Sequence, residues 1–241
     1  MPRASIDEEP PFDGHRWTQK WGFQTGPVSV GGMTDPTYYE QEVEQIWKRL
    51  WLWAGKRTWV PEPGRHFVRD LPFAKTSIIV THGEDGDIRA FHNVCSHRCN
   101  KVAWEERGRG PYLSCPFHGW SYRMDGSLHS VPDEGEFYDI DPEALGLTPI
   151  RCETWADFIF VSLAGEPDES LREYLGDIAT FYDEFPFDSF TQEYHWRVEL
   201  ACNWKIARDA FSEVYHVPFV HGRSAAHGLV ADDMPMPRAL D

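Results

Sequence analysis

The sequence predicts an α+β fold in which a compact antiparallel β module lies between helical regions. Three observations predict it. Apolar residues recur at helical spacing up to about residue 54, short apolar segments separated by turn residues fill 55–163, and helical spacing returns from 164 onwards. The 241 residues suffice for one large domain or two small ones, with a core of ordinary size.

Residues 1–54 are expected to form a polar extended arm followed by one amphipathic helix over about 36–53. Asp35 is a candidate N-cap, and Pro36 suits the first helical position because the N–H that it lacks would be unpaired there anyway. Gly55 stands where such a helix would stop. This region is therefore expected to be an N-terminal arm and helix ahead of the β module.

Residues 55–163 alternate between short apolar segments and turn residues, which is typical of an antiparallel sheet built from hairpins. The glycine-rich and acidic run 83–87 is a candidate hairpin loop. Asp125 followed by Gly126 is a two-residue hairpin signal. We therefore expect a β domain whose strands are joined mostly by tight turns.

Residues 164–241 are expected to open an α+β region. Helical spacing of apolar residues predicts a helix within Pro167–Phe185 and another over about 205–216. Between them, residues 190–204 read as one long strand.

The composition excludes some classes of partner and site. With 23 basic and 39 acidic residues, the formal net charge is −16, which argues against nucleic acid or an anionic membrane as a partner. There is no apolar run long enough for a transmembrane helix and no apolar leader at the N-terminus, so a cytoplasmic protein is expected. Five cysteines at irregular spacing indicate thiols or metal ligands rather than a disulfide framework.

Two cysteines and two histidines form the first candidate site. Cys95 and His97 stand in one expected loop, and Cys115 and His118 stand in a second, so that two hairpin tips can hold one inorganic group. Three interpretations are open: thiols and imidazoles in a core, a Cys2His2 zinc site, and a Rieske [2Fe–2S] cluster. Zinc fingers usually pair Cys with Cys and His with His. In a Rieske cluster two Cys bind one iron and two His bind the other, so the Cys-His alternation favours the cluster.

Glu213, His216 and His221 form the second candidate site. On an unbroken helix His216 and His221 would lie about 140° apart and could not share a metal ion. Pro218 is expected to end the helix, so that the chain can bend and return His221 toward His216. Two unrelated histidines near a helix end are the alternative. The spacing is not the H-E-x-x-H of a zinc protease.

The segments NVCSHRCN (93–100) and SCPFHGWSYRMDG (114–126) resemble the two cluster loops of ring-hydroxylating oxygenase α subunits. The resemblance implies a fold: an antiparallel β Rieske domain inserted in a helix-grip-like α+β catalytic domain, which is incomplete here. It also implies the ligands of a [2Fe–2S] cluster. Cys95 and Cys115 would bind the inner iron, and His97 and His118 would bind the outer one.

Two departures from that family change what we expect of the cluster. Cys99 stands where the family often has glycine, and we expect a buried or half-buried thiol there. The second loop has Phe117 and no second cysteine, so the disulfide that joins the loops in respiratory-type Rieske proteins cannot form. Without that bridge, and with no hydroxyl at positions 116 and 117, we expect a midpoint potential of roughly −150 mV, at the low end of the Rieske range.

NWK (203–205) followed by E-x-x-H-x4-H (213–221) resembles the mononuclear iron motif of the same family. The resemblance implies that His216 and His221 bind Fe(II) in a 2-His-1-carboxylate triad. Glu213 falls on the family's bridging acid, which would link His216 to His118 of a neighbouring subunit. The carboxylate ligand is expected far downstream, and the acids left after His221 are Asp232, Asp233 and Asp241.

The resemblance implies an oxygenase α subunit in which the Rieske cluster passes electrons to Fe(II), which activates O2 to hydroxylate a small organic substrate. Its expected partners are a ferredoxin or flavin reductase and further subunits, as a homotrimer with or without a β subunit. Two alternatives stay open: a Rieske electron carrier, and a catalytically incomplete fragment. A carrier would need neither NWK nor E-x-x-H-x4-H.

Overall fold

The computed structural model describes residues 29–138, 140–165, 169–190, 192–195, 197–213 and 216–221. The expected arm over 1–28 and the three downstream acids, Asp232, Asp233 and Asp241, lie outside the described residues. The chain divides into two compact units, Tyr39–Arg197 and a second that combines Met1–Tyr38 with Val198–Asp241. None of the helices in the described part of the chain is both long and apolar enough to cross a membrane.

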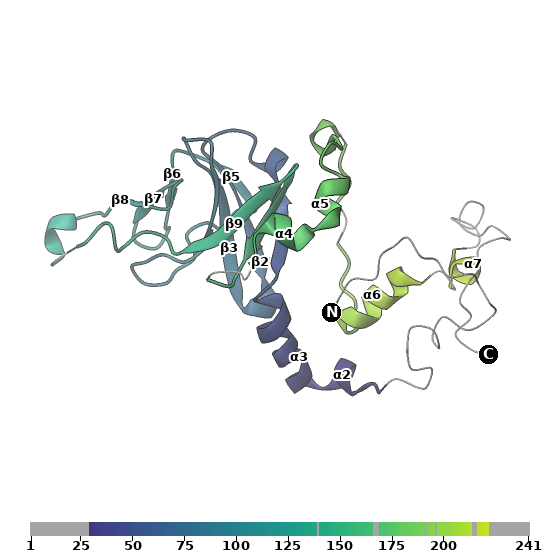
Figure 1. Ribbon diagram of the computed structural model, residues 1–241. Coiled ribbons are helices and arrows are strands. Elements are labelled where there is room, and N and C mark those ends of the chain that lie inside the picture. Colours follow the sequence, from purple (N-terminus) through teal and green to yellow (C-terminus); the bar gives the residue numbers. More distant parts are fainter. Residues whose placement is uncertain are drawn as a thin grey trace. The chain divides into compact units, whose positions relative to one another are not determined.

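Two antiparallel sheets form the centre of the first unit (Figure 1). Among the described residues the larger sheet has seven strands in the order β1-β10-β9-β4-β3-β2-β5, and the smaller has three in the order β6-β7-β8. The strands are β1 Trp51–Lys56, β2 Arg65–Leu71, β3 Thr76–His82, β4 Ile88–His92, β5 Arg107–Arg109, β6 Tyr112–Ser114, β7 Ser121–Arg123, β8 Leu128–Ser130, β9 Pro149–Trp155 and β10 Phe158–Ser162.

Strand β3 is buried on both faces and contributes to two hydrophobic cores. Ile78 and Val80 belong to one core, which lies among the long strands. Ile79 points the other way, because side chains alternate along a strand, and packs in the second core with residues of the small sheet. The second core contains Cys95 and Cys115, so the expected metal-binding loops rest on one face of the large sheet.

The expected hairpins of the β module form. β3 pairs with β4, and their connection is closed by the Gly83 N–H donating to the Asp87 carbonyl at 2.9 Å. β7 pairs with β8 around Gly126, whose φ of +85° suits glycine. Its neighbour Asp125 accepts a hydrogen bond from the Ser127 N–H at 2.9 Å. The alternating pattern over 55–163 therefore predicted the sheet correctly.

The N-terminal helix is shorter than the expected 36–53. It begins as expected, with Asp35 accepting from the Thr37 N–H at 2.9 Å, and forms α3 Pro36–Glu42 and one π-helical turn, η1 Val43–Trp47. The chain then enters β1, which starts at Trp51. Gly55 is not a helix stop but a strand residue at an irregularity in the β1–β10 pairing. The short elements before β9 are α2 Gly31–Thr34, η2 Arg57–Trp59, η3 Pro72–Ala74 and η4 Glu134–Glu136.

The residues after β10 form short helices, as Figure 1 shows. They are α4 Leu171–Leu175, α5 Asp177–Phe181, η5 Phe187–Ser189, α6 Trp204–Ser212 and α7 Val217–Val220. The expected long strand over 190–204 is wrong for its described residues, none of which lies in a strand. Among the described residues from 164 onwards, no strand is seen in the region where the catalytic domain was expected to begin.

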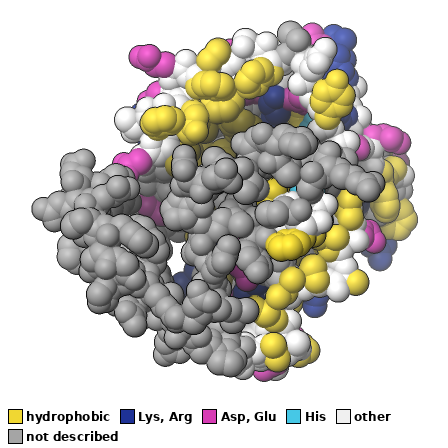
Figure 2. All heavy atoms as spheres, turned by 90° about the vertical axis from the view of Figure 1, so that its right-hand side faces the viewer, with side chains coloured by type: hydrophobic (Ala, Val, Ile, Leu, Met, Phe, Trp, Pro, Cys, Tyr) yellow, Lys and Arg dark blue, Asp and Glu magenta, His cyan; other side chains and the backbone are white. Residues whose placement is uncertain are grey.

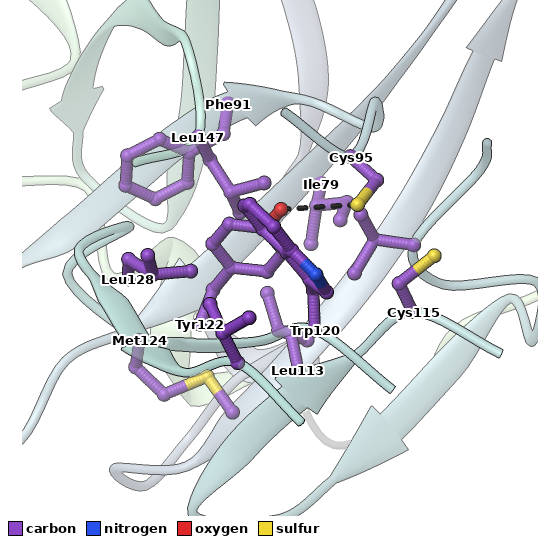
Figure 3. Close-up of a cluster of buried hydrophobic side chains, with 12 residues drawn as sticks. Ile79, Phe91, Cys95, Leu113, Cys115, Trp120, Tyr122, Met124, Leu128 and Leu147 are labelled. Carbon is purple, nitrogen blue, oxygen red and sulfur yellow. Dashed lines mark hydrogen bonds between the residues drawn. The ribbon is translucent and has the colours of Figure 1, made fainter. Parts of the chain in front are cut away.

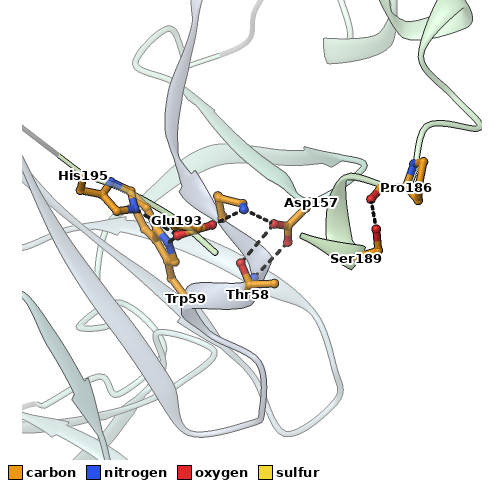
Figure 4. A network of polar contacts seen from close by, with 8 residues as sticks. Thr58, Trp59, Asp157, Pro186, Ser189, Glu193 and His195 are labelled. Atoms are coloured by element: carbon orange, nitrogen blue, oxygen red, sulfur yellow. Dashed lines mark hydrogen bonds and ion pairs between the residues drawn. The ribbon is translucent and has the colours of Figure 1, made fainter. Parts of the chain in front are cut away.

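A half-buried lysine joins the segment around Glu193 to the β module through ion pairs (Figure 4). Lys56, whose side chain is 12 % exposed, pairs with Asp157 at 3.0 Å and with Glu193. Asp157 also accepts from the Thr58 N–H at 3.0 Å. Glu193 accepts from Trp59 Nε1 at 3.1 Å, so one carboxylate holds two residues of the β module.

Several large hydrophobic residues are exposed in the region after β10. Figure 2 shows groups of hydrophobic side chains open to the surface on the face that it presents. The most exposed residues of this region, at half or more of their surface, are Ile178, Phe181, Phe190, Tyr194, Val198, Leu200, Phe211, Phe219 and Val220.

Candidate metal centres

The two Cys-His loops are held by different parts of the fold. The first runs from β4 to β5, which are not neighbours in the sheet, so it is not the hairpin tip that was expected. Buried Asn93 anchors it instead, because its side-chain oxygen accepts from the N–H groups of Val102 and Ala103, each at 2.9 Å. The second loop joins the paired strands β6 and β7 and is a hairpin tip as expected.

The two thiols of the candidate site are buried and lie on the same side of the second core (Figure 3). Each thiol influences the ionisation of the other, and neither is in a disulfide. Burial raises the pKa of the Cys95 thiol. Burial acts on Cys115 in the same direction, but hydrogen bonds, first from the Phe117 N–H, outweigh it and lower the pKa of that thiol. Two adjacent sulfurs with N–H donors around them suit a shared metal group.

Tyr122 is a residue of this site that the sequence analysis missed. Its hydroxyl lies 3.1 Å from Cys95 Sγ and accepts from the Ser96 N–H at 3.0 Å, as Figure 3 shows for the thiol contact. Burial and the Cys95 contact raise the pKa of Tyr122, so the hydroxyl keeps its proton and can donate to the sulfur. No hydroxyl was expected near the cluster because positions 116 and 117 lack one. Tyr122 on β7 nevertheless brings a hydroxyl to Cys95 Sγ.

The two imidazoles of the candidate site lie next to each other. The ring centroids of His97 and His118 are 4.6 Å apart. His97 Nδ1 is buried and has no hydrogen-bond partner. Burial, with the nearby His118 and Arg98, lowers the pKa of His97 and keeps it neutral, the form that binds metals. Two buried thiols and two adjacent imidazoles, one with an unpaired buried nitrogen, are a donor set that fits a [2Fe–2S] cluster of the Rieske type.

Cys99 differs from expectation, because its thiol is exposed and not buried. Its φ of +57° lies in the left-handed region, where glycine is favoured. The local backbone therefore requires the conformation for which glycine is the usual residue.

The second motif lies on a broken helix. α6 begins after Asn203, whose side-chain oxygen accepts from the Lys205 N–H at 3.0 Å, and ends at Ser212. Glu213 is extended, with φ −123° and ψ 156°, so the helix stops before the motif and not at Pro218. Pro218 lies in the first turn of α7, a position that proline tolerates.

Around α7, His216 contacts Glu213 and lies near His221. The Glu213 carboxylate contacts His216 twice, accepting from its backbone N–H at 3.2 Å and pairing with ring Nδ1. His216 precedes α7 and His221 follows it, and their ring centroids are 5.4 Å apart. Two imidazoles at this separation can share one metal ion, with Nδ1 of His216 held by the carboxylate. Within the described part of the chain, no set of three or more Cys, His, Asp or Glu side chains is gathered for one metal ion.

Comparisons with known proteins agree with both halves of this geometry. Residues 51–150 match the family described as Rieske [2Fe-2S] domain. Residues 187–237 match the ring hydroxylating alpha subunit (catalytic domain).

The similar proteins are named as monooxygenases and dioxygenases. The chain is 33% identical to choline monooxygenase of Spinacia oleracea over 88% of this chain and 46% of the relative. It is 30% identical to the glycine betaine monooxygenase oxygenase subunit of Pseudomonas aeruginosa over 85% of this chain and 47% of the relative. The crystal structure of a naphthalene 1,2-dioxygenase F352V mutant superposes with a TM-score of 0.70 at 31% identity, covering 81% of this chain and 45% of that one.

The chain therefore spans about half the length of the curated relatives that it matches. Its two family matches follow one another in the order of a single polypeptide, first the cluster domain and then the start of the catalytic domain. The Cys-His loops and the Glu213 motif each fall inside one of these matches. From these matches, the chain carries a Rieske [2Fe-2S] domain followed by part of the catalytic domain of a ring-hydroxylating α subunit.

Proposed function

We propose that this chain carries the electron-transferring domain and the first iron ligands of a Rieske oxygenase. In this proposal Cys95 and Cys115 bind the inner iron of the cluster, and His97 and His118 bind the outer iron. The domain organisation proposed with it is an arm and helix over 1–54, the Rieske domain over 55–163 and the start of the catalytic domain over 164–241.

One observation favours an oxygenase over a simple electron carrier. Glu213 contacts both the ring and the backbone of His216, and His221 lies beside them. An electron carrier needs no such carboxylate and pair of histidines. We propose that His216 and His221 hold a mononuclear Fe(II), which when bound supplies the activation of O2. The third, carboxylate ligand is proposed to lie further along the catalytic domain.

The chain's own residues have definite parts in this proposal. Glu213 accepts a hydrogen bond from His216 Nδ1–H, which fixes the tautomer with the proton on Nδ1 and leaves Nε2 as the nitrogen that binds metal. The other carboxylate oxygen already accepts from the His216 backbone N–H, and because a carboxylate oxygen has two lone pairs it can also accept from a His118 N–H presented by a neighbouring subunit. This arrangement implies a head-to-tail homotrimer, with or without a β subunit, and a ferredoxin or flavin reductase as electron donor.

The proposed substrate is a small organic molecule of one of two classes. The relatives are named for choline and glycine betaine, and the solved structure for naphthalene. A quaternary ammonium compound and an aromatic ring are therefore the two classes to test. The residues that choose between them lie mostly in the catalytic domain.

Metal and sulfide content tests the proposal on the purified full-length oxygenase, which includes the carboxylate ligand, reconstituted without oxygen. We expect three irons and two acid-labile sulfides per chain. His216→Ala should remove one iron and no sulfide, whereas Cys115→Ser should remove the cluster irons and both sulfides. Two irons and two sulfides in the unaltered chain would favour the electron carrier or the catalytically incomplete fragment, and no sulfide would contradict a Rieske cluster.

A further inference from the structure

A backbone hydrogen bond between Cys95 and Asn100 closes the first cluster loop. The Cys95 N–H donates to the Asn100 carbonyl at 2.8 Å, and the Cys99 N–H donates to the Cys95 carbonyl at 3.0 Å. The residue four places after the first cysteine, Cys99, has a φ of +57°. The loop therefore turns tightly, and Asn100 is its closing residue.

The second loop repeats this conformation. The Cys115 N–H donates to the Trp120 carbonyl at 2.8 Å, and the Gly119 N–H donates to the Cys115 carbonyl at 2.9 Å. Gly119 has a φ of +75°. Trp120 is thus the closing residue of the second loop, in the same position as Asn100 in the first, although the two residues share no chemistry.

The side chain of Asn100 reaches across to the opposite loop. One hydrogen of Nδ2 is donated to the Lys101 carbonyl at 2.8 Å, within its own loop. The same nitrogen also donates to Cys115 Sγ at 3.8 Å, a contact within the range of hydrogen bonds to sulfur. An amide carries two N–H hydrogens, so it can make both bonds at once. Asn100 therefore holds one cysteine through its backbone and the other through its side chain.

The side chain of Trp120 reaches across in the other direction. Its ring stacks on His97 of the first loop, with centroids 4.8 Å apart and planes 7° from parallel. Trp120 is buried, so the stacked imidazole has a fixed partner on one face. Each closing residue thus contacts a candidate ligand of the opposite loop: Asn100 a sulfur, and Trp120 an imidazole.

From these crossed contacts we infer that Asn100 and Trp120 are a pair of positioning residues that hold the two cluster loops in register without a covalent bridge. The inference rests on the proposed assignment of Cys95, His97, Cys115 and His118 as ligands. All five cysteines are free, so no disulfide joins the loops. The two contacts differ in effect, because Asn100 places a dipole on a ligand sulfur and Trp120 limits the rotation of a ligand ring.

The Asn100 contact has an electronic consequence that a purely structural role lacks. A reduced cluster carries one more negative charge than an oxidised one, and an N–H donor at a ligand sulfur stabilises that charge. Removing the donor should therefore lower the midpoint potential. If Asn100 only shaped the loop through its bond to Lys101, its substitution would change the stability of the fold and leave the midpoint potential unchanged.

The test is a redox titration, followed by EPR, of the whole chain carrying a reconstituted cluster. Asn100→Leu should reduce the ratio of reduced to oxidised cluster about threefold to tenfold at a fixed potential, which is a fall of roughly 30–60 mV for one electron. Asn100→Ser, which is too short to reach the sulfur, should give a fall of similar size and covers the case in which the leucine variant does not fold. A wild-type midpoint in whichever of these variants binds cluster would overturn the role of Asn100.

Asn93→Ser is the matched control, because Asn93 anchors the same loop but donates to Ser77 and Ala103 and to neither cysteine. It should lower the unfolding midpoint without moving the redox midpoint. If it lowers the potential as much as the Asn100 variants do, loop stability explains the effect and the inference fails. Failure of the unaltered chain to bind any cluster would contradict the proposed function instead.

Trp120 is tested by the nitrogen couplings of the histidine ligands in pulsed EPR of the reduced cluster. Trp120→Phe keeps an aromatic ring against His97 and should preserve these couplings. Trp120→Leu removes the stacking partner and should broaden or shift one of the two sets of couplings. Unchanged couplings in Trp120→Leu would show that Trp120 does not position His97, and Asn100 would be the one positioning residue left in the inference.

Discussion

At the scale of single residues, the candidate ligands could be predicted from spacing alone, but the groups that adjust their chemistry could not. Cys95, His97, Cys115 and His118 belong to a local pattern that needs no knowledge of the fold. The contact of Tyr122 with Cys95 joins residues 27 positions apart and depends on how β7 packs under the first loop. No periodicity or motif in one sequence reports such a contact.

Tyr122 gives the first prediction at this scale. Tyr122→Phe removes one hydroxyl donor from Cys95 Sγ and should lower the midpoint potential of the cluster. A hydrogen bond of about 1 kcal/mol corresponds to roughly 40 mV for one electron, given 59 mV per tenfold change. The measurement is an EPR redox titration of the reconstituted chain, with Tyr112→Phe as control, since Tyr112 stacks on His129 and not on the cysteines.

The hydroxyl also changes the potential expected for the unaltered protein. Tyr122 supplies a donor that the value of about −150 mV left out, so the midpoint should lie above the low end of the Rieske range. An unchanged potential in Tyr122→Phe would show that this hydroxyl does not donate to the sulfur when iron is bound.

At the scale of elements, local patterns predicted where helices begin better than where they end. Asp35 and Pro36 begin α3 as expected, but the chain leaves the helix to place Trp51 in the core of the sheet. Gly55 is required by packing, because a Cβ there would lie 2.7 Å from both Phe67 and Trp59. A glycine at a helix stop and a glycine at a crowded strand look the same in a sequence, and only the neighbours distinguish them.

The segment around Glu193 was expected to be a strand and is held by side chains instead. Lys56 lies between Asp157, which is 2 % exposed, and Glu193, so removing the lysine leaves a buried carboxylate without its cation. Lys56→Met should therefore lower the free energy of unfolding by about 3 kcal/mol. Lys48→Met is the control, because Lys48 pairs with Glu44 at an exposed site and should cost less than about 0.5 kcal/mol. Urea denaturation measures both.

The stability that this network contributes to the fold depends on pH. Hydrogen bonds from Lys56 and His195 lower the pKa of Glu193 to about 2, from an ordinary value of 4.5. A lowered carboxyl pKa stabilises the fold above the ordinary value, and this contribution is lost as the pH falls from 4.5 through about 2. Glu193→Gln should thus be less stable than the unaltered chain at pH 7 and should approach its stability near pH 2. A stability difference that stays constant over this range would contradict the assignment.

At the scale of the whole molecule, the two candidate metal centres belong to different compact units. The Cys-His loops lie within Tyr39–Arg197, whereas Glu213 and the two histidines lie in the unit that contains Val198–Asp241. Patterns in the sequence predicted both candidate centres, because each is a short local motif. The described residues of the strand expected over 190–204 form no strand, because an apolar pattern in one segment does not show which other strand it would pair with.

The proposed route between the centres crosses from one subunit to the next, and complementation in mixed oligomers tests it. In the full-length oxygenase, Glu213→Gln keeps both sites but weakens the carboxylate that would join His216 to a neighbour's His118, because the amide has lost the charge and one acceptor. Cys115→Ser keeps Glu213 and the mononuclear site but cannot hold the cluster. Each variant alone should give almost no product.

When the two variants are assembled together, a subunit with an intact cluster can sit beside one with an intact Glu213. In a randomly mixed head-to-tail ring this productive pairing occurs at about one junction in four, so roughly a quarter of the wild-type product per site should return. Product is measured in a single turnover, with the clusters reduced beforehand and O2 added with substrate. Mixing the variants after assembly, without exchange of subunits, is the control and should restore nothing. If co-assembly fails to restore product while Glu213→Gln alone is inactive, the electrons pass within one subunit. If Glu213→Gln alone turns over like the wild type, the carboxylate is not on the path at all.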